Sequence, residues 1–431
     1  MRRKAKNKPV RLPASVKCFS IITVQCYQPN CKTIVICNIN VTLFCLFLLC
    51  MTPMISKLPQ TGTTIFTVMS ALAAEVGAIN LSQGFPDFDT SPELIKLVNT
   101  AMKKGHNQYA PMPGVLALRE QIAKKTEKLY GAKYNPDTEI TITAGGTQAI
   151  FTAITAVVNQ NDEVIIFEPA FDCYAPAIKL MGGIVKSLAL EPPDYRIPWA
   201  MVKRLINSRT RMIILNSPQN PTATILHKED IDELCAIVKS QDIFILSDEV
   251  YEHLIYDGEM HHSMARYAEL QQRSFIVASF GKPFHATGWK VGYCMAPAHL
   301  MNEFRKVHQF LVFSVNAPIQ YAIAEYLKNE NHYLDLPGFF QQKRDYFRKG
   351  LEQSRFQLLP CYGSYFQSVT YNKITDEKDS EFSLRLTKEI GVASIPTSVF
   401  YSKGVDHHVL RFCFAKKQET LDKAVERLMR V

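Results

Sequence analysis

From residue 139 onward, the chain alternates short apolar runs with longer segments of helical pattern. The runs are rich in Val, Ile and Leu and lack the regular polar positions of a strand that has one face in water. Such strands are buried on both faces, so the pattern predicts an α/β fold in which helices cover a mainly parallel sheet. We expect strands at residues 139–144, 163–167, 184–190, 211–216, 243–247, 275–279 and 290–295, and helices at 147–158, 172–182, 198–208 and 228–240.

The pattern changes after about residue 300, where long helical segments take over. We expect helices at 300–313, 317–330 and 338–354, followed by a smaller α+β domain with strands at 365–370 and 409–414 and helices at 381–390 and 418–430. A chain of 431 residues is long enough for two or three domains.

The net charge of +9 comes from one end of the chain. Residues 1–50 hold eight of the 49 basic side chains and no acidic one, which leaves 41 basic against 40 acidic side chains in the remainder. The folded part is therefore balanced in charge, and a nucleic-acid or membrane partner is not indicated.

The same fifty residues carry six of the eleven cysteines, and none of these has the paired C-x-x-C spacing of a zinc site. The other five cysteines are scattered through apolar surroundings, which is typical of free thiols in a reducing compartment. We expect no metal site.

An apolar run at 41–51 reaches membrane-spanning length only when it is extended to 33–51, across several polar residues. As a signal anchor it would place the remaining chain outside the cytoplasm, which suits neither the free thiols nor the chemistry below. We expect that the natural product begins at Met51 or Met54 and is cytoplasmic. A membrane-tethered protein is the alternative.

One lysine, Lys282, stands just past the expected strand at 275–279, in Ser279-Phe-Gly-Lys282. A buried amine must be neutralised, paired or covalently bound, and a desolvated amine is what Schiff-base chemistry with a carbonyl requires. Ser279 and Lys290 lie close enough in sequence to hold a phosphate. A solvated surface lysine would be the simpler interpretation if Lys282 stood alone.

Other polar or special residues also follow expected strands. Gly145-Gly146-Thr147 opens a helix, and such a helix start can bind an anion or can be a plain turn. Neither the GxGxxG nor the GxxxxGK[ST] motif is present.

Phe171, Asn220, Asp248 and Tyr251 follow three further strands. Taken singly, Phe171 is best explained as a core aromatic, Asn220 as a turn residue and Asp248 as a helix cap. Together they place an aromatic ring, an amide, a carboxylate and a phenol beside a lysine.

Arg411 lies inside the apolar segment 409–414. A buried guanidinium needs a carboxylate, which belongs either to an internal salt bridge or to a ligand that it binds with two parallel hydrogen bonds.

These motifs, in this order, resemble the class I/II aminotransferases of fold type I, which depend on pyridoxal 5'-phosphate (PLP). The resemblance runs from about residue 54 to 431 and is closest to the methionine and kynurenine–oxoglutarate aminotransferase branch. The motifs that carry it are Ser279-x-x-Lys282, Ser247-Asp-Glu-Val-Tyr251, Asn220-Pro-Thr, Thr287-Gly-Trp-Lys290, Leu410-Arg411-Phe, Leu81-Ser-Gln-Gly-Phe-Pro-Asp-Phe88, Gln108-Tyr-Ala-Pro-Met-Pro-Gly114 and Phe167-Glu-Pro-Ala-Phe-Asp-Cys-Tyr174.

The resemblance implies a role for each candidate residue. Lys282 would bind PLP covalently and shuttle the proton, and Asp248 would keep the pyridine nitrogen protonated. The other implied roles are as follows: Asn220 and Tyr251 on the ring hydroxyl; Phe171 on the ring face; Gly145, Gly146, Thr147, Ser279 and Lys290 on the phosphate; Tyr109 on the phosphate of the neighbouring subunit of a homodimer; and Arg411, Asn220 and the backbone at Gly84 on the substrate carboxylate.

The resemblance also implies a division of the chain. Residues 1–53 would be an extension outside the fold, 54–80 a segment associated with the small domain, 81–312 the large PLP-binding domain and 313–431 the small domain.

Two positions depart from the family pattern. Pro283 follows the lysine where Ser or Thr is usual, and we expect that activity survives this change. Ala223 stands where many relatives have glycine, so we expect its turn to avoid positive φ.

The predicted function is transfer of an amino group from methionine or an aromatic amino acid to a 2-oxo acid. The aromatic residues expected near the site (Phe85, Tyr109, Phe171, Phe310 and Phe313) suit such side chains better than a dicarboxylate. The alternatives are a PLP-dependent cysteine-S-conjugate β-lyase and a non-catalytic PLP-binding regulator. His285, His308, His407 and His408 show no ligand spacing.

Overall fold

The computed structural model describes residues 54–59 and 61–431, and its helices and strands all lie in one unit, Gln60–Val431. The expected extension, with its apolar run and six of the cysteines, lies outside the described residues. Among the residues described, no helix is both long and apolar enough to cross a membrane.

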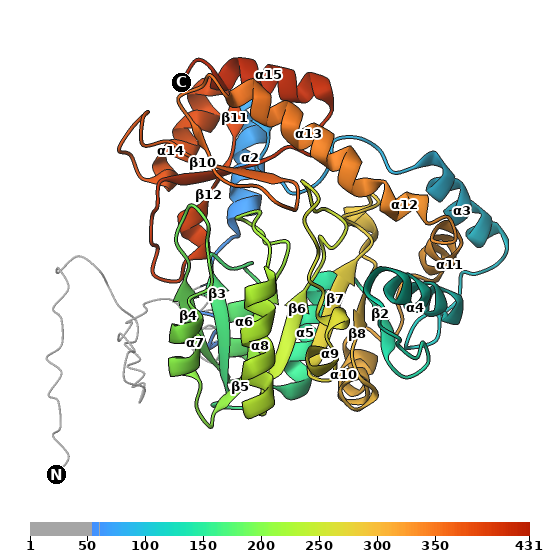
Figure 1. Ribbon diagram of the computed structural model, residues 1–431. Coiled ribbons are helices and arrows are strands. Elements are labelled where there is room, and N and C mark those ends of the chain that lie inside the picture. Colours follow the sequence, from blue (N-terminus) through green and yellow to red (C-terminus); the bar gives the residue numbers. More distant parts are fainter. Residues whose placement is uncertain (1–53, 60) are drawn as a thin grey trace, which may run out of the picture. The chain divides into compact units, whose positions relative to one another are not determined.

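The centre of this unit is a seven-stranded sheet with the strand order β2-β8-β7-β6-β5-β3-β4 (Figure 1). All neighbours are parallel except at β8, which runs antiparallel to β2 and β7. The strands are β2 (Ile140–Thr143), β3 (Glu163–Glu168), β4 (Ile184–Ala189), β5 (Thr210–Asn216), β6 (Phe244–Asp248), β7 (Ser274–Ser279) and β8 (Gly292–Met295). The predicted α/β fold with a mainly parallel seven-stranded sheet is confirmed, and each strand lies within two residues of its predicted bounds.

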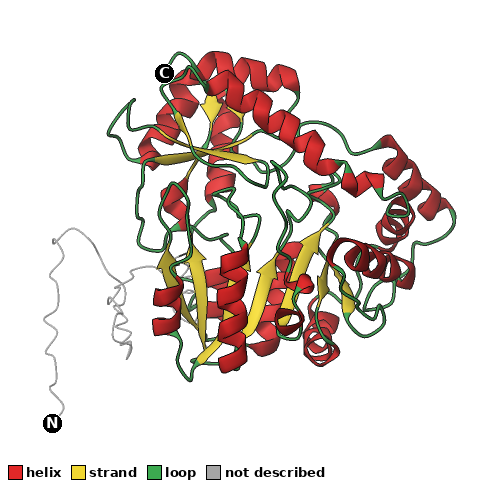
Figure 2. Ribbon diagram, in the orientation of Figure 1, coloured by secondary structure: helices red, strands yellow, loops and turns green. Residues whose placement is uncertain are grey.

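Helices cover both faces of this sheet, as its apolar strands require (Figure 2). Alternate strand residues separate into two cores, so Val164 and Ile214 belong to one and Ile165 and Ile213 to the other. One face carries α5 (Gly146–Val157), α6 (Tyr174–Leu180) and α10 (Ala298–Leu311), and the other carries α7 (Trp199–Leu205), α8 (Lys228–Ser240) and α9 (Ala268–Gln271).

Three more helices pack together beside the sheet: α3 (Pro92–Lys103), α4 (Leu116–Tyr130) and α11 (Ala317–Tyr326). The first two lie between residues 81 and 138, where we predicted no element. The start of α3 carries a readable signal, because Pro92 occupies its first turn directly after Ser91.

The C-terminal part forms the predicted smaller α+β unit. An antiparallel sheet has the order β12-β13-β10-β9, and a short parallel pair joins β1 to β11. Its elements are β1 (Ile79–Asn80), β9 (Gln357–Leu358), β10 (Phe366–Thr370), β11 (Val392–Ala393), β12 (Ile395–Pro396), β13 (Val409–Cys413), α2 (Ile65–Val76), α12 (Asn331–Leu334), α13 (Leu336–Leu351), α14 (Asp379–Arg385), a π-helical turn (Leu386–Ile390) and α15 (Gln418–Leu428). The domain boundaries at 80/81 and 312/313 stay predictions.

Strand β8 approaches the loop after β2 so closely that only glycine fits at its first residue. A Cβ atom at Gly292 would lie 2.7 Å from the carbonyl oxygen of Ala278 and 3.0 Å from the carbonyl carbon of Gly145. Both contacts are with backbone atoms, which cannot rotate away.

We therefore predict that Gly292→Ala lowers the free energy of unfolding of the apoprotein by about 1–3 kcal/mol, as overpacking does. Denaturant unfolding at a fixed protein concentration measures this. The matched control is Gly338→Ala, in the first turn of α13, where a Cβ meets no atom within 4 Å. The control is expected to raise stability by roughly 0.5–1 kcal/mol, and equal stabilities of the two variants would contradict the prediction.

Candidate active site

A cavity of about 240 Å³ lies at the carboxyl ends of the parallel strands. The structure brings ten of the thirteen predicted site residues to its wall: Gly145, Gly146, Thr147, Phe171, Asn220, Asp248, Tyr251, Ser279, Lys282 and Lys290. Prediction from sequence missed five others that line it: Ile150, Asn216, Val250, Gly281 and Thr287.

Strand direction explains why residues so far apart in sequence meet here. Asn216, Asp248 and Ser279 are the last residues of three neighbouring parallel strands, β5, β6 and β7, so they end at the same edge. Strand β8 runs the opposite way, so its beginning, just after Lys290, lies at that edge too.

Lys282 lines the cavity. Its Nζ donates a hydrogen bond to the carbonyl oxygen of Gly84 at 3.1 Å and lies 5.5 Å and 5.6 Å from the ring centres of Tyr251 and Tyr365. Burial lowers the pKa of Lys282 to about 8, because the charged ammonium loses its hydration. The amine is therefore about half neutral at pH 8, where a solvated lysine is almost fully charged.

Asp248 is 3% exposed and faces the same cavity. Its Oδ2 accepts a hydrogen bond from the hydroxyl of Tyr174 at 2.6 Å, and its Oδ1 accepts one from the backbone N–H of Val250 at 3.3 Å. Burial raises the pKa of Asp248 to about 6. The two hydrogen-bond donors and the charge of Lys282 oppose this rise, because each favours the ionised carboxylate. The carboxylate is therefore mostly ionised at neutral pH.

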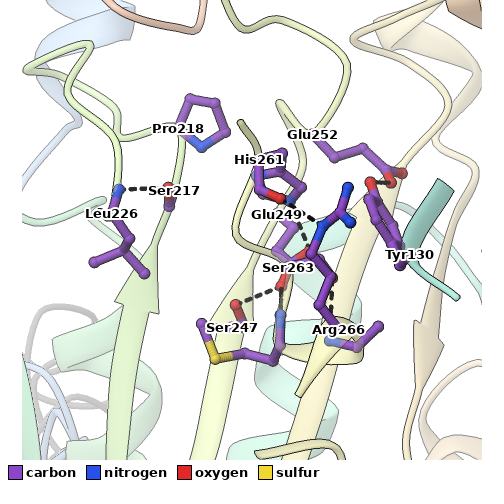
Figure 3. A network of polar contacts seen from close by, with 12 residues as sticks. Tyr130, Ser217, Pro218, Leu226, Ser247, Glu249, Glu252, His261, Ser263 and Arg266 are labelled. Carbon is purple, nitrogen blue, oxygen red and sulfur yellow. Dashed lines mark hydrogen bonds and ion pairs between the residues drawn. The ribbon is translucent and has the colours of Figure 1, made fainter. Parts of the chain in front are cut away.

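The loop after β6 is anchored by a second carboxylate, Glu249, which does not line the cavity and takes part in a network of polar contacts (Figure 3). Its oxygens accept hydrogen bonds from the Ser247 hydroxyl at 2.8 Å and the Met264 backbone at 3.0 Å, and one lies 2.8 Å from His261 Nε2.

A third carboxylate, Glu252, forms a buried cluster at the other end of this loop. It pairs with Lys125 of α4 and accepts hydrogen bonds from the hydroxyls of Tyr130 and Tyr293. One ammonium and two hydroxyl donors stabilise the ionised form of this buried carboxylate, so the pKa of Glu252 lies far below its ordinary value. Asp248 and Tyr251 thus lie on a loop that is fixed at both ends.

One wall of the cavity is built for an anion. Gly145 has φ of +83°, and a Cβ atom there would lie 3.3 Å from Lys290 Nζ. The first residues of α5 direct free N–H groups toward the same place, and the side chains of Thr147 and Ser279 line it. A helix start, a cation and hydroxyls are the groups that a phosphate requires.

Arg411, in β13, is completely buried. Its Nη1 donates to Asn220 Oδ1 and its Nη2 to the carbonyl oxygen of Ser82, both at 2.6 Å, while its Nε has no hydrogen-bond partner among the residues described. The guanidinium lies 3.9 Å from the ring centre of Phe366, and burial lowers its pKa to about 10.

No carboxylate among residues 54–59 and 61–431 lies within salt-bridge distance of Arg411. Of the two explanations that the sequence left open, the structure thus favours a carboxylate supplied by a ligand, because a buried unpaired charge is costly.

The remaining predicted residues lie outside the cavity wall. The carbonyl oxygen of Gly84 accepts hydrogen bonds from Lys282 and from the hydroxyl of Tyr365. Tyr109 is 83% exposed and contacts Phe313 edge-to-face at 5.4 Å. Of the five aromatic residues expected near the substrate, only Phe171 lines the cavity of the described chain.

The expectation that Ala223 avoids positive φ is wrong, because its φ is +63°. Backbone hydrogen bonds hold this conformation: the N–H of Ala223 donates to Gln219, and its carbonyl accepts from Tyr362 and Gly363. Three backbone hydrogen bonds offset a left-handed penalty of about 1–2 kcal/mol.

The residues present fit PLP. An amine whose pKa is lowered to about 8 suits its aldehyde, and an ionised carboxylate suits a protonated ring nitrogen. The cavity wall around Gly145 suits its phosphate, and Phe171 offers a ring to stack on.

Comparison with known proteins agrees with this chemistry. Residues 76–428 match the family model described as aminotransferase class I and II. The chain is 52% identical over 374 residues to methionine aminotransferase of Escherichia coli, covering 86% of this chain and 97% of that protein. It is 32% identical over 411 residues to kynurenine–oxoglutarate transaminase of Dictyostelium discoideum, covering 86% and 94%.

A solved structure from Escherichia coli, of a protein for which a methionine aminotransferase function was identified, superposes with a TM-score of 0.86. Its sequence is 52% identical, and the match covers 88% of this chain and all of that one. The chain therefore belongs to the class I and II aminotransferases, and it is a PLP-dependent transaminase of fold type I.

Proposed function

We propose that this enzyme transfers the amino group of methionine or an aromatic amino acid to a 2-oxo acid, with Lys282 as its catalytic base. The observation that carries the proposal is that one cavity is lined both by a buried amine of lowered pKa, Lys282, and by a buried carboxylate, Asp248. When bound, PLP supplies an aldehyde that takes up the amino group and a ring that withdraws electrons from the substrate Cα.

The residues of the chain divide the remaining work. Lys282 Nζ would hold PLP at its aldehyde, and its amine would be the base that accepts the proton from the substrate Cα. Asp248 keeps the ring nitrogen protonated. Tyr251 and Asn220 bind the ring hydroxyl, and Phe171 stacks on the ring face.

Binding groups at the two ends of the cavity set the orientation. Gly145, Gly146, Thr147, Ser279 and Lys290 hold the phosphate. At the other end, Arg411 binds the substrate carboxylate together with Asn220 and the backbone at Gly84. Fixing both ends aligns the Cα–H bond with Lys282, which reduces the entropy lost on reaching the transition state.

Two observations support a methionine or aromatic substrate. The relatives named above act on methionine and kynurenine. In addition, the cations that line the cavity of the described chain are Lys282 and Lys290, and both are engaged by the cofactor in this proposal. A dicarboxylate substrate would need a further cation for its side chain.

We also propose a cytoplasmic homodimer in which Tyr109 reaches the phosphate of the neighbouring subunit. The exposed positions of Tyr109, Phe310 (88% exposed) and Phe313 (53% exposed) support a partner surface there. The free thiols of all five cysteines in the described part of the chain support a reducing compartment.

The substrate assignment is tested with a panel of amino donors and one fixed 2-oxo acid. Methionine, phenylalanine and tyrosine are expected to give a higher kcat/KM than aspartate and glutamate. A preference for aspartate would overturn the assignment. Release of pyruvate from a cysteine S-conjugate without any 2-oxo acid would identify a β-lyase instead.

The lowered pKa of Lys282 predicts how fast the apoenzyme binds PLP covalently at different pH values. Only the neutral amine attacks an aldehyde, so the rate constant should rise about tenfold per pH unit below pH 8 and level off above it. Stopped-flow absorbance measures this rate. Nα-acetyl-lysine is the control, and its rate should keep rising toward about pH 10.4.

A second readout of the same prediction is chemical. Borohydride reduction should fix the cofactor on Lys282, while Lys282→Arg should remain unlabelled and lose transamination. An apoenzyme profile that rises toward pH 10 would contradict the buried amine, and full activity of Lys282→Arg would end the proposal.

Arg411→Lys should lower kcat/KM for every amino donor by about 10- to 100-fold, because an ammonium cannot make the paired hydrogen bonds of a guanidinium. PLP affinity should fall far less than kcat/KM, since Arg411 does not line the cofactor cavity and acts on it only through Asn220. Steady-state kinetics and an absorbance titration separate the two effects. Arg355→Lys, at an exposed arginine, is the matched control, and wild-type KM values in Arg411→Lys would refute the role.

A further inference from the structure

Tyr174 reaches the carboxylate of Asp248 from the side of the sheet that α6 covers. It is the first residue of α6, it is 3% exposed, and its hydroxyl donates to Asp248 Oδ2 at 2.6 Å. Burial and the neighbouring carboxylate raise the pKa of Tyr174 well above its ordinary value. The phenol therefore stays protonated near neutral pH and can donate its hydrogen to the carboxylate.

The two oxygens of Asp248 are held by different segments of the chain. The backbone of Val250 binds Oδ1 from the loop after β6, whereas Tyr174 binds Oδ2 from α6. Val250 is on the same loop as Asp248 and moves with it. Tyr174 is thus the side chain that fixes the carboxylate relative to a different element.

The same helix start also carries the ring that faces the cavity. Phe171 lies three residues before Tyr174, and the two rings meet edge-to-face at 5.8 Å. The segment 171–174 therefore contacts both the place where a cofactor ring would stack and the carboxylate that serves its nitrogen.

We propose that Tyr174 is a positioning residue: its hydroxyl keeps Asp248 ionised and fixed in orientation for the ring nitrogen of bound PLP. This inference rests on the role proposed for Asp248 above. Tyr174 touches neither cofactor nor substrate in this assignment, and it acts through the carboxylate.

Other groups around Asp248 also influence its ionisation. They are Lys282 across the cavity, Glu249 on the same loop, Cys173 beside Tyr174 and Tyr251. Of these, Lys282 favours the ionised form, but a neutral Lys282, or one bound covalently, no longer supplies its charge. The hydrogen bond from Tyr174 is then the remaining side-chain contact that favours the carboxylate.

The test is Tyr174→Phe in the full-length enzyme, with PLP affinity measured by absorbance titration between pH 6 and pH 9. Loss of one hydrogen bond to a charged group should weaken PLP binding about tenfold or more at pH 7. The defect should shrink toward pH 9, because the higher pH ionises Asp248 without help from Tyr174. A general packing defect would weaken binding equally at all pH values.

Two buried tyrosines provide matched controls. The hydroxyl of Tyr130 donates to Glu252 outside the cavity, and the hydroxyl of Tyr134 has no hydrogen-bond partner in the described part of the chain. Tyr130→Phe should lower stability, Tyr134→Phe should change it little, and both should keep the wild-type pH profile of PLP affinity.

A double-mutant cycle with Asp248→Asn provides a second measurement, which separates the contact with Asp248 from a general loss of packing at Tyr174. The Asp248→Asn background removes the carboxylate, so adding Tyr174→Phe should cause less than a threefold further loss of PLP affinity. Additive losses would overturn the inference, as would a Tyr174→Phe variant with the wild-type profile. Failure of the wild-type enzyme to bind PLP would instead overturn the proposed function itself.

Discussion

The chemistry of this enzyme depends on taking three ionisable side chains out of water in or beside the cavity at the carboxyl ends of the parallel strands. Burial favours the neutral form of each group, so it lowers the pKa of Lys282 and of Arg411 and raises the pKa of Asp248. A group whose pKa lies close to the working pH, such as Lys282, can accept and release a proton. A desolvated charge, such as that of Arg411, binds an opposite charge strongly. The parallel strands supply this environment because their carboxyl ends leave a gap lined by backbone and flanked by helices.

Much of this arrangement follows from sequence, and the reason is physical. Buried parallel strands need apolar side chains on both faces, so Glu163–Glu168 and Ser274–Ser279 stand out as continuous runs with sharp ends. The first polar residue after each run then marks the edge where ligands bind. The same reasoning should have identified Asn216, which ends β5 and lines the cavity.

Other parts of the site leave no such trace. Tyr174 is 74 positions from Asp248, and Lys125 is 127 positions from Glu252. Nothing in the local pattern shows that such pairs meet, because the contact depends on how helices pack on the sheet. The prediction for the φ angle of Ala223 was wrong for a related reason. Its left-handed backbone is held by hydrogen bonds from Tyr362 and Gly363, which are far away in the sequence.

The loop after β6 shows how buried charges with opposite requirements can stand side by side. Asp248 must remain available to a ligand, and it therefore has few donors and a pKa near 6. Glu252, four residues later, is surrounded by an ammonium and two phenols, which lower its pKa far below the ordinary value. A fully satisfied carboxylate holds its segment in place but is unavailable to other partners. The loop therefore uses Glu252 for rigidity, which allows Asp248 to stay incompletely satisfied without losing its position.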